Sequence, residues 1–172
     1  MPVKINTSNF NAERTESNNQ LGQFARRKKL KEAETLFAKM EEKNQTNEVS
    51  FAVMMNAFVR CGQIEAAENI LVRMVKQGYH ASVISYTTLM KGLCSAGRLQ
   101  DAVALLDRME AEEVKPNIRT FNTLLRGCLT VGGVKEAQYV FERLRATRDC
   151  SPDGSSLEMM TTLLCQGSKF KV

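Results

Sequence analysis

The stretch VISYTTLMKGLCSAGRL, at residues 83–99, decides the fold of this chain. Gly97 lies near its end, where a residue in the left-handed conformation would end a helix, and Ser85 is predicted as the N-cap of that helix. The apolar side chains before Gly97 recur every three or four residues, as on one face of an α-helix, at Tyr86, Leu89, Met90, Leu93 and Cys94. The stretch therefore predicts one short helix that ends in a tight turn.

The pattern returns along the chain at a constant step. Gly62, Gly97 and Gly132 are separated by 97 − 62 = 35 and by 132 − 97 = 35 residues. A second apolar stripe follows each glycine, and in the middle unit it consists of Leu99, Ala102, Leu106 and Met109. The same step relates an aromatic column and an alanine column, which are Phe51, Tyr86 and Phe121, and Ala67, Ala102 and Ala137. Each unit is therefore predicted to be a hairpin of two helices that the small alanine lets approach closely.

These hairpins predict an all-α fold, a right-handed α-solenoid of tandem helix-turn-helix repeats. A degenerate repeat, in which Lys28 stands where the others have glycine, is expected to cap the array with a first helix from about Thr15 to Arg27. The N-terminal residues are polar and aperiodic, which predicts a disordered tail. The predicted segments are this tail at 1–13, the capping repeat at 14–47, full repeats at 48–82, 83–117 and 118–153, and a C-terminal capping helix or truncated repeat at 154–172.

The composition fits helices and argues against several other classes of protein. Hydrophobic residues make up 43% of the 172 residues and aromatic residues only 6%, whereas an all-β protein would need more Val, Ile, Tyr and Trp. No stretch approaches the roughly 20 apolar residues that span a bilayer. A net charge of +5 is compatible with nucleic acid, although many proteins without that function carry as much.

Residues that could bind a metal or catalyse a reaction do not cluster in the sequence. The five cysteines form no Cys-x-x-Cys pair, and His80 is the single histidine, so neither a metal nor another cofactor is expected. Gly132 and Gly133 belong to an interhelix turn rather than to a phosphate-binding loop, and the carboxylates are spread along helix faces. The chain is therefore expected not to be an enzyme.

Residues 83–99, with Asp101-Ala102, Met109 and Pro116-Asn117, closely resemble the pentatricopeptide-repeat consensus. Residues 118–153 match it well, residues 48–82 less fully, and residues 14–47 weakly. The other helical hairpin of similar length, the tetratricopeptide repeat, has a tryptophan signature, and this chain has no Trp. The chain is identified as a short array of the pentatricopeptide type, and the resemblance implies that it binds single-stranded RNA, one base per repeat.

In that family, the residue after the aromatic and the last residue of the repeat contact the base edge. The resemblance assigns these base-reading roles to Ala52 with Ser82, Thr87 with Asn117, and Asn122 with Asp153. Family pairing habits imply adenine for the second pair and uracil for the third, whereas Ala52 has no side-chain hydrogen bond to offer. The alternative is that these short polar side chains are only helix caps and turn residues.

Other contacts follow from the same resemblance. A basic residue late in the first helix contacts phosphate in the family, and Arg60 and Arg26 occupy that place, whereas Ser95 and Thr130 do not fit it. The residue two places before the aromatic flanks the base, which implies this role for Val49, Ile84 and Arg119. The capping repeat would add a further base-reading pair, Asn18 with either Asn47 or Glu48.

The resemblance implies a non-catalytic role in RNA processing, stability or translation. It also implies a mitochondrial or plastid location, and the lack of a clear transit peptide leaves the cytoplasm as the alternative. Each of three or four nucleotides would contribute about 1–3 kcal/mol, against an association cost of about 4–15 kcal/mol. The chain is therefore expected to act with other ribonucleoprotein or protein subunits, or within a longer array, and not on a membrane. The competing class is a protein-binding scaffold whose groove holds a peptide or partner helix.

Overall fold

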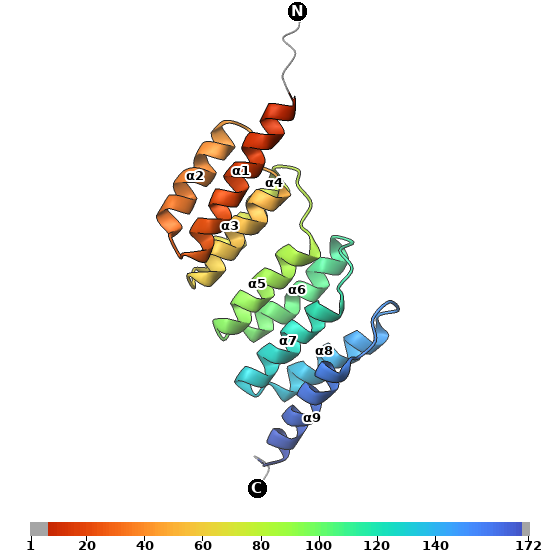
Figure 1. Ribbon diagram of the computed structural model, residues 1–172. Helices are drawn as coiled ribbons and strands as arrows, with labels where there is room; N and C mark the ends of the chain where they lie inside the picture. The colour runs from red at the N-terminus through yellow and green to blue at the C-terminus, as the bar shows by residue number, and fades with distance from the viewer. Residues whose placement is uncertain (1–6, 170–172) are drawn as a thin grey trace, which may run out of the picture. The chain divides into compact units, whose positions relative to one another are not determined.

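The computed structural model describes residues 7–169 and is drawn in Figure 1. These residues form nine α-helices and no strand, which confirms the predicted all-α class. None of the described helices is long and apolar enough to cross a membrane. In chain order the helices are α1 (Thr7–Arg26), α2 (Leu30–Glu42), α3 (Glu48–Arg60), α4 (Ile64–Lys76), α5 (Val83–Ser95), α6 (Leu99–Ala111), α7 (Ile118–Val131), α8 (Val134–Ala146) and α9 (Gly154–Lys169).

The helices fall into two compact units, whose boundary in the sequence lies between Ala81 and Ser82. In the first unit, α1 pairs with α2 and α3 with α4, and α3 packs beside α1 (Figure 1). In the second unit, α5 pairs with α6 and α7 with α8, and α7 packs against both α5 and α9. Each unit thus consists of helical hairpins stacked side by side, as the predicted solenoid requires, while its right-handed turn and the repeat bounds stay predictions.

The first helices of three hairpins, α3, α5 and α7, begin with side-chain caps. Oδ1 of Asn117 accepts a hydrogen bond from the backbone N–H of Thr120 at 3.1 Å, and the Asn117 N–H donates to the Thr120 hydroxyl at 3.3 Å. Asn47 caps α3 in the same reciprocal way. Ser82 caps α5, so the prediction of Ser85 as N-cap was wrong: Ser85 is the third helical residue, and its N–H donates to the Ser82 hydroxyl at 3.3 Å. These caps satisfy backbone donors that the first turn leaves unpaired.

The turn inside each hairpin depends on a residue in the left-handed region. Gly97 has a φ of 76°, which confirms its predicted role at the end of α5. Lys28 adopts a φ of 57° at the corresponding turn of the capping repeat, although a side chain makes that conformation costly. The backbone geometry of the turn is therefore kept even where glycine is absent.

The columns that repeat in the sequence form the core of each unit. Every residue of the aromatic column is at most 1% exposed, and every residue of the alanine column is 0% exposed. In the first unit, Phe51 meets the ring of Phe37 edge-on, with 5.1 Å between the ring centroids, and lies 5.4 Å from the ring of Tyr79. The structural role predicted for these columns is confirmed.

The N-terminal segment differs from its prediction. Helix α1 begins at Thr7 rather than near Thr15, so residues 7–13, predicted as part of a disordered tail, are helical. Residues 1–6 of that tail lie outside the described residues. Most of α1 is exposed or half-buried, and Leu21 and Ala25 are its two buried apolar residues among the side chains described. So few buried positions make no apolar stripe, which is why the sequence predicted only the part of this helix from about Thr15 and placed residues 7–13 in the tail.

Helix α9 follows the last hairpin as a single helix. It packs on α7 and α8 and buries Met159, Met160 and Leu163. Asp153 caps it, because its Oδ1 accepts a hydrogen bond from the Ser156 N–H at 2.8 Å. The predicted choice between a capping helix and the start of a further repeat stays open.

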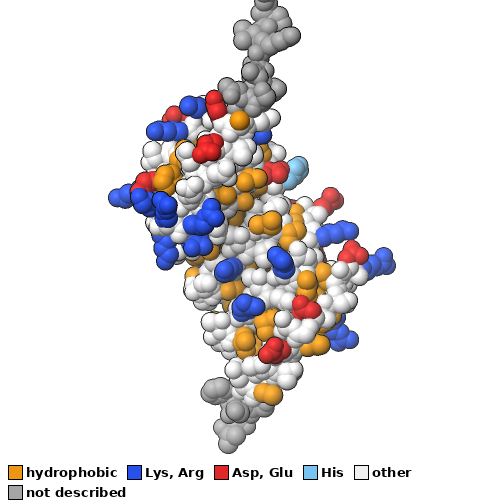
Figure 2. All heavy atoms as spheres, viewed as in Figure 1, with side chains coloured by type: hydrophobic (Ala, Val, Ile, Leu, Met, Phe, Trp, Pro, Cys, Tyr) orange, Lys and Arg blue, Asp and Glu red, His pale blue; other side chains and the backbone are white. Residues whose placement is uncertain are grey.

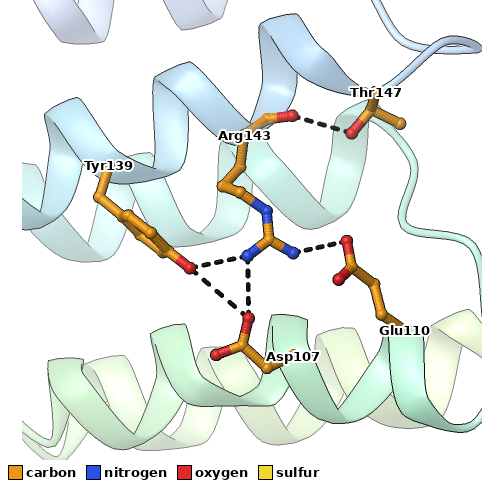
Figure 3. A network of polar contacts seen from close by, with 5 residues as sticks. All are labelled: Asp107, Glu110, Tyr139, Arg143 and Thr147. Atoms are coloured by element: carbon orange, nitrogen blue, oxygen red, sulfur yellow. Dashed lines mark hydrogen bonds and ion pairs between the residues drawn. The ribbon is translucent and has the colours of Figure 1, made fainter.

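An arginine network, made of Asp107, Glu110, Tyr139 and Arg143, joins the second helices of neighbouring hairpins (Figure 3). Arg143 of α8 contacts Oδ1 of Asp107 at 2.8 Å and Oε1 of Glu110 at 2.5 Å, both on α6. It also donates to the Tyr139 hydroxyl at 2.7 Å. The hydrogen bond to Asp107 is the largest of the effects that raise the pKa of Arg143. In the first unit, Arg73 of α4 pairs similarly with Glu41 of α2.

Candidate nucleic-acid interface

The capped ends of the first helices bring predicted base-reading residues together. In the second unit, Nδ2 of Asn122 on α7 donates to both carboxylate oxygens of Asp153, at 3.2 and 3.0 Å. The backbone hydrogen bond from Ser156 is the main cause that lowers the pKa of Asp153, with the Asn122 hydrogen bond acting in the same direction. Asp153 is therefore an anion at neutral pH. Oδ1 of Asn122 is buried and has no hydrogen-bond partner among the described residues.

The first unit contains an equivalent pair. Nδ2 of Asn18 on α1 donates to Oδ1 of Asn47 at 3.3 Å, and the Ser50 hydroxyl donates to Oδ1 of Asn18 at 2.7 Å. The structure thus places Asn47, the N-cap of α3, beside Asn18, whereas Glu48 is an exposed residue of the first helical turn. Of the two partners left open by the sequence, Asn47 is the one hydrogen-bonded to Asn18.

Of the other two pairs, one lies within the second unit and the other has one residue in each unit. Thr87 is half-buried on α5 and donates to the carbonyl of Val83, while Asn117 is exposed at the cap of α7, and no hydrogen bond joins them among the described residues. Ala52 is half-buried on α3 of the first unit. Ser82 is exposed at the cap of α5 in the second unit.

The predicted flanking residues and phosphate contacts are on the surface. Val49 on the first turn of α3 is 54% exposed and Ile84 on the first turn of α5 is 71% exposed. Arg119 is exposed on the first turn of α7. Arg60 and Arg26 are exposed at the ends of α3 and α1. Figure 2 shows basic side chains gathered on the first unit and separate ones over the second.

A groove of about 450 Å³ lies between α5 and α7. This α5–α7 groove contains the predicted residues Asn122 and Arg119. It also contains Lys91 and Arg126, both exposed, which sequence reasoning did not select. Each follows a predicted base-reading residue by four positions, 91 − 87 = 4 and 126 − 122 = 4, and therefore lies one helical turn further on the same face. That spacing was a signal from which they could have been found.

The floor of the groove explains why α5 and α7 lie so close. A Cβ atom on Gly127 would lie 2.3 Å from Sγ of Cys94 and 2.8 Å from its Cβ. Burial raises the pKa of Cys94 to about 11 and that of Cys128 to about 12. Both thiols are therefore protonated at neutral pH and act as packing groups rather than as nucleophiles.

Comparison with known proteins identifies the repeat. The sequence profile of the PPR repeat family matches residues 46–95 and 81–130, and that of the PPR repeat matches residues 21–45 and 119–146. This chain belongs to the pentatricopeptide-repeat family. The resemblance predicted from the sequence is confirmed. No curated protein sequence matches the chain.

Solved structures share the fold of this pentatricopeptide-repeat chain. The pentatricopeptide repeat protein PPR10 from maize has a TM-score of 0.79 and 22% identity over 90% of this chain and 22% of that one. Nuclear proteinaceous RNase P 2 from A. thaliana has a TM-score of 0.74 and 14% identity over 91% of this chain and 35% of that one. The PPR domain of Arabidopsis thaliana protein-only RNase P 1 in complex with tRNA has a TM-score of 0.66 and 20% identity over 79% and 70% of the two chains. The chain spans about a fifth of the length of the maize protein.

Proposed function

We propose that this chain binds single-stranded RNA along the capped ends of its first helices and is not itself a catalyst. The bases contact the residue pairs at those ends, between the exposed flanking residues. The proposed pairs are Asn18 with Asn47, Ala52 with Ser82, Thr87 with Asn117, and Asn122 with Asp153. Solved relatives in this fold include PPR10 with an 18-nt psaJ RNA element, which supports the proposal.

The hydrogen-bonded pair of Asn122 and Asp153 is the observation that carries this proposal. The Asp153 carboxylate can accept the N3–H of uracil, and the Asn122 amide can donate to a uracil carbonyl. Their mutual hydrogen bonds hold both side chains in place before a base arrives, which lowers the ordering cost of binding. Uracil is therefore the proposed base at this pair, and adenine the one at Thr87 with Asn117.

The three cations in the lining of the α5–α7 groove favour RNA over the competing protein scaffold. A groove for a peptide or partner helix would expose a contiguous apolar surface. Lys91, Arg119 and Arg126 line this groove instead. The four pairs would give only weak binding, because about 1–3 kcal/mol per base is set against an association cost of about 4–15 kcal/mol. We therefore propose that the chain acts with other subunits or within a longer array. Its proposed role is in RNA processing, stability or translation, in a mitochondrion or plastid.

Titration of the full chain with short single-stranded RNAs tests this function. RNAs with and without an adenine-uracil step are compared at two salt concentrations. We expect measurable binding at low salt, weaker binding at high salt, and a preference for the step. Absence of binding at low salt would refute RNA binding by this chain.

A double exchange tests the base-reading pairs themselves. Replacing Thr87→Asn together with Asn122→Thr leaves the composition and charge of the chain unchanged. We expect the adenine-uracil preference to be lost, because the exchange leaves Asn117 and Asp153 in place and so makes two new pairs, neither of which equals an original one. An unchanged preference would mean that these positions do not contact the base edges.

A further inference from the structure

The α5–α7 groove gathers cations that have no acidic partner. Lys91, Arg119 and Arg126 line it, and none of them makes an ion pair with a described residue. The groove has no acidic lining residue in the described part of the chain, and its rim includes the hydroxyls of Ser95 and Thr130. Two arginines on second helices differ, since Arg73 and Arg143 each pair with carboxylates of the preceding hairpin. The α5–α7 groove is thus lined by positive charge that no carboxylate of the described residues neutralises.

The position of these cations along the helices differs between the two units. In the first unit, Arg60 ends α3, and the positions one and two repeats later are Ser95 and Thr130. In the second unit, the cations are Lys91 and Arg126, four residues earlier in each helix. Four residues of an α-helix rise about 6 Å, so the cations lie about one turn nearer to the capped ends. Asn56 of α3 occupies the position that corresponds to Lys91, because 91 − 35 = 56.

We propose that the α5–α7 groove is an anion subsite in which Lys91 and Arg126 bind a phosphodiester of the RNA strand. This inference rests on the proposed function and adds the residues that hold the backbone in the second unit. Two cations on adjacent helices can approach one phosphate from both sides, and the Ser95 hydroxyl, which also lines the groove, supplies a further donor. Asn122 lines the same groove, so the phosphate lies next to the base that this residue contacts. In the second unit the RNA backbone is therefore bound about one helical turn closer to the capped helix ends. In the first unit Arg60 and Arg26 bind it further from those ends.

The first test removes the two cations from the full chain. The variant K91S/R126T is titrated with the RNA that contains the adenine-uracil step, over a series of salt concentrations. We expect affinity to fall about tenfold at low salt and the slope of log K against log salt to decrease by about 0.7 per lost phosphate contact. The matched control K135S/R145T removes the same charge from exposed positions on α8 and should change affinity less than about twofold. An equal loss of RNA affinity in both variants would overturn the subsite, because the loss would then follow from the net charge of the chain and not from the position of the cations.

The second test moves the cations without changing net charge. The variant K91S/S95K/R126T/T130R places them at the positions that correspond to Arg60. We expect its affinity to stay as low as that of K91S/R126T. Recovery to the affinity of the unmodified chain would overturn the proposal that the phosphate lies at Lys91 and Arg126.

These results separate the subsite from the proposed function. If R26S/R60S weakens binding while K91S/R126T does not, RNA binding stands and the subsite is wrong. If the unmodified chain binds no RNA at low salt, both fail together. The four groove positions are exposed or at a groove rim, and thermal melting of each variant checks that the fold is retained.

Discussion

Ala57 of α3 and Gly127 of α7 occupy the same place in the repeat, since 127 − 57 = 70 is two steps of 35, yet their surroundings differ. Ala57 is buried at 1% exposure, so the first unit has room for its methyl group. The second unit has none at Gly127, where a Cβ would overlap Cys94. The first unit also gathers Phe37, Phe51 and Tyr79 in one cluster. The comparison teaches that the repeat fixes which positions are buried, while the spacing of the helices depends on the residues that fill them.

The largest expected effect tests how tightly the second unit is packed. Ala102 of α6 is 0% exposed, and Ala102→Leu should lower the free energy of unfolding by about 1–3 kcal/mol through overpacking. Urea denaturation measures the change. Ala104→Leu, at an exposed position of the same helix, is the control and should change stability by less than about 0.5 kcal/mol. Equal effects would contradict the close approach of α5 and α6 at Ala102.

Adding one methyl group to the floor of the groove tests directly whether the second unit has no room for a side chain at Gly127. Gly127→Ala should lower the free energy of unfolding by about 1–2 kcal/mol, because Cys94 must move. Amide hydrogen exchange should show the loss of protection in α5 and α7 first.

Gly22→Ala is the control for that substitution. The nearest atom to a Cβ on Gly22 lies 3.9 Å away, so alanine should raise the stability of α1 by about 0.5–1 kcal/mol. Destabilisation of both variants by the same amount would show that helix glycines in the two units are equivalent, against the difference drawn above.

The arginine pairs of the two units provide a smaller contrast. The Arg143 side chain is 25% exposed and contacts two carboxylates, whereas that of Arg73 is 47% exposed and contacts one. Arg143→Met should therefore cost about 1 kcal/mol, and Arg73→Met about half as much. Thermal melting at low and high salt measures both, with Arg145→Met on the exposed face of α8 as the control. A larger loss of stability for Arg73→Met than for Arg143→Met would contradict the expected order of the two contributions.

A similarly small effect concerns the turn of the capping repeat. Lys28→Gly gives that turn the glycine of the other repeats and should raise the free energy of unfolding by about 0.5–1 kcal/mol, since φ is 57° there. Lys29→Gly is the control, because Lys29 has a φ of −85° and no such strain to lose. Chemical denaturation of both variants measures the difference. A loss of stability in Lys28→Gly would mean that the lysine side chain contributes more than its strained backbone costs.

The hairpins could be predicted from the sequence because burial repeats with the helices. Three columns repeat every 35 residues, those of Phe121, Ala102 and Gly97. A polar residue in the first, a larger residue in the second, or a residue that disfavours a positive φ in the third would disturb the fold, so the columns can be recognised without a structure. The sequence could not show in the same way which of two serines is the N-cap of α5. Ser82 and Ser85 both carry hydroxyls three residues apart and bond to each other, and only the backbone angles decide which of them precedes the helix.

The candidate site was less predictable because it depends on surface positions. The sequence did not single out Lys91 and Arg126, because the family position for a phosphate contact falls one turn further along, at Ser95 and Thr130. The pairing of Asn18 with Asn47 needed the packing of α3 on α1, which no spacing within one repeat reveals. Contact of any of these residues with a base stays a prediction for the titrations above.

The same side chain ends one repeat as a base-reading residue and begins the next as a helix cap. Asn47, Ser82, Asn117 and Asp153 hold this double role under the proposed function. A cap replaced by an apolar residue costs about 1 kcal/mol of stability. Changes of RNA preference at this position are therefore confined, over evolution, to the few residues that can cap a helix. The requirements of folding therefore limit the set of residues with which the RNA preference of such a protein can be changed.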